Sequence, residues 1–151
     1  MMWFNKKHPQ TLYIDLEPRE KGVIACRPEF EAKPDLIADF RALPFPDKSF
    51  KHIVWDPPQL LNLGQTSIMR KKYGSLKTET WRYDLGKGFE ELWRVLDDNG
   101  TLIFKWNEAD IPLKDVLHLF KQQPLYGHPT AKHGKTIWVA FFKEVQDATT
   151  N

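Results

Sequence analysis

The chain has 151 residues, of which 41% are hydrophobic, 13% are aromatic and 28% are charged, and its formal net charge is +2 at pH 7. This composition excludes a disordered chain, the length predicts one domain with a real core, and the charge is too small to indicate a polyanion partner by itself. The single cysteine, Cys26, excludes an internal disulfide framework and a cysteine-rich zinc site. No window approaches the roughly 18 apolar residues of a membrane span and no signal peptide is apparent, so we expect a cytoplasmic protein without a membrane partner.

Three short strands are predicted in the first part of the chain, and each ends on or near an acidic residue. The third strand runs straight into two prolines, Pro57 and Pro58, which cannot donate to a sheet ladder. That strand must therefore end at Asp56. Ligands bind at the carboxyl ends of strands in an open α/β sheet, so Asp56 is a candidate site residue. The three strands are TLYIDL (11–16), DLIAD (35–39) and KHIVWD (51–56).

The remainder of the chain predicts two helices, a further strand and a closing hairpin. The first helix has apolar side chains at steps of three and four, although Gly86 and Gly88 weaken it. The second has Pro112 in its first turn, where a missing N–H costs little. Together the elements predict a Rossmann-like, mostly parallel α/β sheet with an antiparallel C-terminal hairpin. They are a helix over 78–97, a turn at 97–100, a strand at 101–106, a helix over 111–120, and paired strands at 124–127 and 136–143.

In this order the pieces resemble the class I S-adenosylmethionine-dependent methyltransferases, over most of residues 11–143. LYIDLEPRE looks like the family's strand whose terminal acid binds the cofactor ribose, which implies that role for Asp15. ADFRALPFPDKSFKHIV looks like the third-strand region, which implies that Asp39 lies near the adenine amino group and Phe40 beside the ring. FEELWRVLDDNGTLIF looks like the helix, turn and strand that follow. The resemblance implies a methyltransferase-like domain over 1–143 with a polar tail at 144–151.

The same three residues also fit ordinary structural roles. Asp15 and Asp39 fit helix caps or solvated strand ends, and Phe40 fits a simple core position. The resemblance implies S-adenosylmethionine as the cofactor, and the chemistry of methyl transfer needs no metal.

DPPQ resembles the Asp-Pro-Pro-aromatic stretch of amino-methyltransferases that act on nucleic-acid bases. The resemblance implies that Asp56, Pro57, Pro58 and Gln59 are catalytic: the carboxylate and the Pro57 carbonyl would accept the hydrogens of an exocyclic amine, and proline would hold them rigid. The alternative is a strand-ending turn with an incidental acid.

Gln59 departs from that pattern, because enzymes that flip a base stack it on an aromatic ring. Trp55, Trp106 and Tyr73 are the other rings that the sequence offers. Lys105 and Trp106 end a predicted strand near the expected pocket, although the pair also fits an ordinary strand end with an extended lysine.

No glycine-rich turn follows a predicted strand, as it would in the family. MMWFNKKHP itself resembles the segment just after a Cys-Cys-Gly-Ser-Arg turn in a group of phage and bacterial methyltransferase-like proteins. That group shares the patterns FPDKSFKHIVWDPP, KKYG and GTLIFKWNE. We therefore expect a chain that begins at an internal methionine and lacks the first strand. Unpaired strand edges would then give weak cofactor binding and self-association.

Residues 62–88 carry six basic residues against two acidic ones. This excess directly follows Asp-Pro-Pro and favours a DNA or RNA substrate, with Arg70, Lys71, Lys72 and Lys77 as candidate phosphate contacts. The alternative is a solvated surface. Two other functions stay open, namely a non-catalytic binding module and a methyltransferase for a small molecule or a protein amine.

Overall fold

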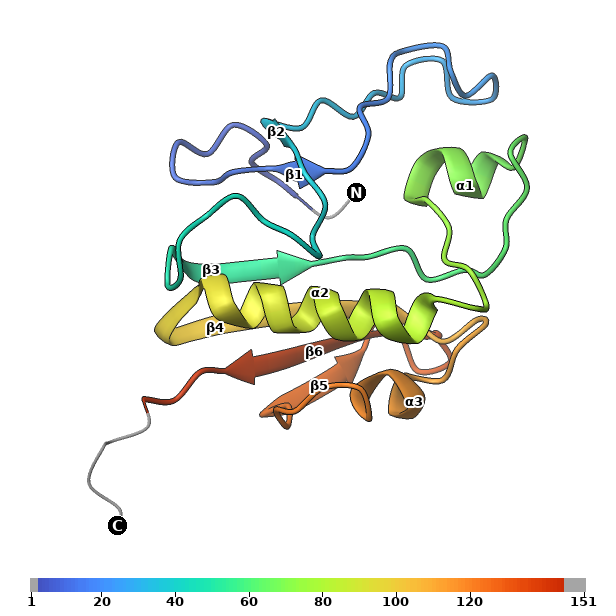
Figure 1. Cartoon of the computed structure of the whole chain (residues 1–151). Helices are drawn as coiled ribbons and strands as arrows, with labels where there is room; N and C mark the ends of the chain where they lie inside the picture. The colour runs from blue at the N-terminus through green and yellow to red at the C-terminus, as the bar shows by residue number, and fades with distance from the viewer. Residues whose placement is uncertain (1–2, 146–151) are drawn as a thin grey trace. The chain divides into compact units, whose positions relative to one another are not determined.

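The structure is a computed structural model that describes residues 3–145, and the chain forms two compact units, residues 1–40 and 41–151 (Figure 1). Of the polar tail predicted at 144–151, only Glu144 and Val145 lie within the described residues.

In the first unit, two parallel strands form a small sheet: β1 (Ile14–Asp15) and β2 (Leu36–Ile37). The backbone N–H of Tyr13 donates to the Asp35 carboxylate at 2.8 Å, which holds the start of one strand against the start of the other. At the other end, the backbone N–H of Ala38 donates to the carbonyl of Asp15 at 3.0 Å. Both strands occur where the sequence predicts them, but each is only two residues long.

The second unit contains a four-stranded sheet in the order β3-β4-β6-β5. β3 and β4 are parallel, whereas β4 and β6, and β5 and β6, are antiparallel. A mixed α/β fold and an antiparallel C-terminal hairpin are therefore confirmed, and two of the four pairs of strands formed by residues 3–145 are parallel. The elements of this unit are β3 (Phe50–Trp55), α1 (Ile68–Tyr73), α2 (Trp81–Val95), β4 (Leu96–Asn107), α3 (Leu113–Leu117), β5 (Tyr126–Pro129) and β6 (Thr136–Phe142).

The apolar face of α2 packs on this sheet and forms the core (Figure 1). Phe89 is 1% exposed and stacks on Phe120, with ring centroids 4.0 Å apart. Alternate residues of β4, including Phe104 and Trp106, are fully buried, as period-two alternation requires. Each fully buried large apolar side chain stabilises the fold by about 1.5–3 kcal/mol. The helical periodicity predicted over 78–97 is confirmed, and buried Gly88 lies within the helix without ending it.

Residues 97–100 do not form the turn that the sequence predicts, since they belong to β4. The register between β3 and β4 shifts after Phe50, so the extra residues are accommodated as an irregularity in the ladder. Asn99 has a φ of 59°, and a Cβ on Gly100 would lie 2.7 Å from the Asp97 carbonyl oxygen. Gly100, which suggests a turn in the sequence, is therefore needed because the backbone at Asp97 leaves no room for a side chain.

The loop that leads into β3 is clamped by α2. The Glu91 carboxylate accepts from the Leu43 backbone N–H at 2.8 Å and from the Arg94 Nη2 at 2.7 Å. Arg94 in turn donates to the Phe45 carbonyl at 2.9 Å and to Asp47 at 2.7 Å. Glu91 therefore accepts from both the loop and Arg94, and its side chain is only 12% exposed.

Candidate functional site

Asp56 directly follows β3 and lies beside Lys105 of the neighbouring parallel strand β4, which continues to Asn107. Trp55 pairs with Phe104 in the β3–β4 register, so the next residue of each strand, Asp56 and Lys105, face one another. Lys105 Nζ lies 2.8 Å from Asp56 Oδ2. Pro57 is buried and has no N–H, so the ladder ends there and the carboxylate projects from the end of the strand.

Gln59 fixes the other oxygen of the same carboxylate. Its Nε2 donates to Asp56 Oδ1 at 2.8 Å and to the backbone carbonyl of Lys105 at 3.1 Å. Both amide hydrogens of Gln59 are thus used within the protein. Gln59 therefore fixes the position of Asp56, and no hydrogen bond is made by its Oε1 within the described residues.

The Asp56 carboxylate keeps acceptor capacity for a ligand. A carboxylate offers about four lone-pair sites, and Lys105 and Gln59 use one each. The side chain of Asp56 is 32% exposed and that of Lys105 is 25% exposed. A fixed, partly exposed carboxylate of this kind can accept the hydrogens of an amine without reorganising.

Two of the three candidate rings are core residues. Trp55 is 5% exposed, and Trp106 is fully buried with its indole N–H donating to the Ile111 carbonyl at 2.9 Å. Neither can stack on a substrate. Trp138, which the sequence reasoning missed, lies beside the site, since Lys105 Nζ is 5.8 Å from its ring centroid. Tyr73 is 56% exposed.

Residues 60–77 form a loop that is closed at its base. Leu61 bridges Leu76, and the backbone of Leu76 donates to the Leu60 carbonyl at 2.9 Å. The Leu61 N–H donates to the Asp110 carboxylate at 2.7 Å, which ties the loop to the segment after β4. A Cβ on Gly74 would lie 3.0 Å from Pro58 Cγ, so the end of α1 packs on the Asp-Pro-Pro turn. Tyr73 directly precedes Gly74, so this contact also brings Tyr73 to the end of the sheet at which Asp56 lies.

The four predicted phosphate contacts differ in availability. Arg70 donates to the Leu63 carbonyl at 2.8 Å, so its guanidinium helps to hold the loop. Lys71, Lys72 and Lys77 take part in no ion pair among residues 3–145. The three lysines are therefore the cations of this loop that could meet a polyanion.

The residues that the resemblance assigns to the cofactor lie in the first unit. Asp15 ends β1, and its Oδ2 lies 3.0 Å from Arg19 Nη1, with the carboxylate side chain 40% exposed. Asp39 and Phe40 follow β2, and the hydrogen bond from Ala38 to Asp15 places the acids at one edge of this small sheet. Asp56 belongs to the second unit.

Sequence reasoning missed the ion pair of Asp56 and the tether made by Asp110. The sequence places Lys105 near the expected pocket, but its pairing with Asp56 depends on the β3–β4 register, in which Trp55 lies opposite Phe104. Nothing in the sequence signals Asp110, which acts across 49 residues on a backbone N–H.

Comparison of the sequence with models of known protein families gives no match, and a search among curated proteins gives no significant match. None of the helices between residues 3 and 145 has both the length and the apolar character needed to cross a membrane. Over the same range, no group of three or more His, Cys, Asp or Glu side chains could hold a metal ion.

Proposed function

We propose that this chain is an S-adenosylmethionine-dependent methyltransferase that acts on an exocyclic amine of a nucleic-acid base. The observation that carries the proposal is the Asp56 carboxylate, which is fixed by Lys105 and Gln59 at the end of β3 yet keeps free lone pairs. The resemblance of the surrounding sequence to amino-methyltransferases supports the same chemistry.

The reaction needs a nucleophilic nitrogen with its lone pair turned out of conjugation. Asp56 and the Pro57 carbonyl accept the two amine hydrogens and fix the nitrogen in that orientation. When bound, S-adenosylmethionine supplies an electrophilic methyl group on a sulfonium sulfur. Transfer of that methyl group would release one proton from the amine nitrogen, and Asp56 would accept this proton and pass it to water.

The first unit fits the adenosine half of this cofactor in its donor and acceptor groups. A partly exposed carboxylate at Asp15 can accept two ribose hydroxyls, and the acid at Asp39 can accept from an adenine amino group. Asp15 must then share its carboxylate with Arg19 or release that residue.

The loop over 60–77 supports a nucleic-acid substrate. Tyr73 is an exposed ring that the close approach of Gly74 to Pro58 brings to the Asp-Pro-Pro turn, and it could stack on a base. Lys71 and Lys72 directly precede it, and no acid in the described part of the chain forms an ion pair with either. Ring stacking and phosphate contacts together are the usual means of binding single strands.

A non-catalytic binding module is the second candidate. It is favoured by one observation: within residues 3–145, no strand is followed by two closely spaced glycines that could wrap the methionine half of the cofactor.

Transfer of a labelled methyl group from S-adenosylmethionine to single-stranded DNA, RNA and simple amines tests the proposal. We expect Asp56→Asn to lower the transfer rate by about 100-fold or more, in line with positioned acid–base groups, with cofactor binding unchanged. Asp15→Ala should first weaken cofactor binding. Asp115→Asn in α3 is the control carboxylate and should have wild-type activity, because no side-chain hydrogen bond or ion pair joins it to the described residues.

Cofactor binding without transfer to any of these substrates would favour the binding module. Equal loss of cofactor binding in Asp56→Asn and Asp15→Ala would reject the division of roles between the two acids.

A further inference from the structure

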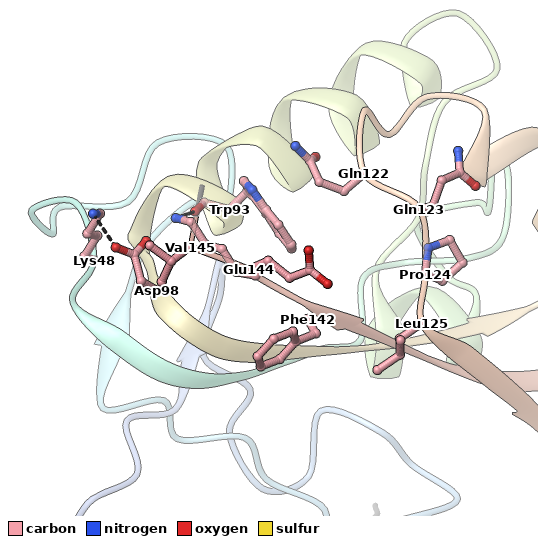
Figure 2. A pocket seen from close by; sticks show the side chains of 11 residues that line it. Lys48, Trp93, Asp98, Gln122, Gln123, Pro124, Leu125, Phe142, Glu144 and Val145 are labelled. Atoms are coloured by element: carbon pink, nitrogen blue, oxygen red, sulfur yellow. Dashed lines mark hydrogen bonds and ion pairs between the residues drawn. The ribbon is translucent and has the colours of Figure 1, made fainter. Parts of the chain in front are cut away.

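A cavity of about 660 Å³ lies away from Asp56, where β4 begins and β6 ends. Its apolar walls come from Trp93 on α2, from Phe142 at the end of β6, and from Pro124 and Leu125 before β5 (Figure 2). Phe142 is 39% exposed and Leu125 is 67% exposed, so these walls are open to a ligand. All of these residues belong to the second unit.

The positive charges around this cavity are already satisfied. Lys48 Nζ pairs with Asp98 Oδ2 at 2.7 Å (Figure 2). Lys143 Nζ donates to the carbonyls of Trp93 and Leu96, at 2.7 and 2.6 Å, and so caps the C-terminal end of α2. Burial lowers the pKa of Lys143, which is the expected result for an amine drawn against the protein. Both ammonium groups therefore already have partners within the protein.

Glu144 is the charged group of the cavity that has no partner. No hydrogen bond or ion pair joins its carboxylate to the described residues. Figure 2 shows this carboxylate directed into the cavity, between the rings of Trp93 and Phe142 in that view. The carboxamide of Gln122 lines the same space and adds an oxygen acceptor.

We infer that this cavity binds an organic cation, a primary ammonium or guanidinium group carried on an apolar body. Glu144 pairs with the cation, the partly exposed ring of Phe142 attracts it through its quadrupole, and Leu125 and Pro124 cover the apolar body. Trp93 serves only as an apolar wall, because its ring stacks on Phe89 and has Lys143 Nζ 5.8 Å from its centroid. This site is independent of the proposed methyl transfer, because it shares no residue with the Asp56 site.

Such a cation can be a free amine or the side chain of lysine or arginine in another polypeptide. Two probes separate these sources: 2-phenylethylammonium, which is a small arylalkylamine, and Nα-acetyl-lysine amide, which represents a protein side chain. For ligands of this size we expect dissociation constants of about 1–10 mM. Whichever probe binds more tightly identifies the source, and either order supports the site.

The test is a titration of the ¹⁵N-labelled full chain, followed by amide and indole N–H shifts in NMR spectra. We expect 2-phenylethylammonium to shift the signals of Trp93, Leu125 and Phe142, and its neutral isostere 2-phenylethanol to bind about threefold more weakly or worse. Glu144→Gln should weaken binding of the cation by about threefold and leave binding of the alcohol unchanged.

Glu79→Gln is the matched control, since Glu79 is exposed and lies outside the cavity. Its affinity for the cation should equal that of the wild type. The inference is overturned if the alcohol or the anion 3-phenylpropionate binds as tightly as the cation, if Glu144→Gln has no effect, or if the shifts map to other residues.

Discussion

Replacing Glu91 with glutamine should destabilise the second unit, because Glu91 joins α2 to the loop before β3. Its carboxylate accepts from Arg94 at 2.7 and 3.0 Å and from the Leu43 N–H at 2.8 Å. Glutamine keeps one oxygen acceptor but loses the charge and the two-point contact with the guanidinium. Hydrogen bonds to charged groups contribute about 1.5–3 kcal/mol, and Arg94 is 33% exposed, so we expect a loss of about 2 kcal/mol at pH 7.

The effect should depend on pH in a defined direction. The hydrogen bond from Arg94, followed by that from Leu43 and the charge of Arg94, lowers the pKa of Glu91 below its usual 4.5, although burial acts against the shift. The folded state thus binds this proton less readily than the unfolded state. The stabilisation is therefore complete above about pH 4.5 and is lost as the pH falls through the lowered pKa.

Urea unfolding followed by tryptophan fluorescence at pH 7, 5 and 3 measures this difference. The wild type and Glu91→Gln should differ by about 2 kcal/mol at pH 7 and should converge at low pH. Glu90→Gln is the control, because Glu90 is 52% exposed and its ion pair with Lys121 spans 3.4 Å, so its loss should be at most about 0.5 kcal/mol. A difference that persists unchanged at pH 3, or equal losses in both variants, would refute this reasoning.

Two further predictions concern the loop and the end of α2. Gly74 has a φ of 75°, and a Cβ placed on it would lie 3.0 Å from Pro58 Cγ. Gly74→Ala should therefore lower the free energy of unfolding in urea by about 1–3 kcal/mol. Gly64→Ala is the control and should be near neutral, because a Cβ there would have nothing within 4 Å. Burial lowers the pKa of Lys143 below 10.5, so the unfolded state binds this proton more tightly than the folded state does. The free energy of unfolding of the wild type should therefore rise as the pH increases from the lowered pKa to 10.5. Lys143→Met should abolish this rise. Unfolding measured at pH 7 to 10.5 should show that rise in the wild type and not in the variant.

The order and type of the main elements could be predicted because they follow from local periodicity. α2 and β6 have strong patterns and long runs, and both occur close to the predicted bounds. α1 was not predicted, since its six residues bury none of their side chains and so carry no apolar period. Its position is instead set by Ser67 at one end and Gly74 at the other.

The place of Asp56 could likewise be predicted from the prolines after it, but the groups that hold it could not. Lys105 and Gln59 reach it through the register of two strands and the fold of a turn, which are tertiary features. The same limit applies to Arg70, whose charge in the sequence favours phosphate binding while its guanidinium is bonded to a backbone carbonyl.

The position of β3 in its sheet gives a structural reason for a glutamine, instead of an aromatic residue, at position 59. The order β3-β4-β6-β5 places β3 at the edge of its sheet, so β4 is its one hydrogen-bonded strand neighbour in that sheet. An aromatic ring at position 59 could stack on a substrate but could not bond to Asp56 and to the backbone of Lys105 at once. The glutamine does both through one nitrogen, at 2.8 and 3.1 Å, and so ties the end of the edge strand to its single neighbour. On this argument the position that departs from the amino-methyltransferase pattern keeps the carboxylate fixed. Under the proposed base methylation, the stacking ring would then be Tyr73 or Trp138.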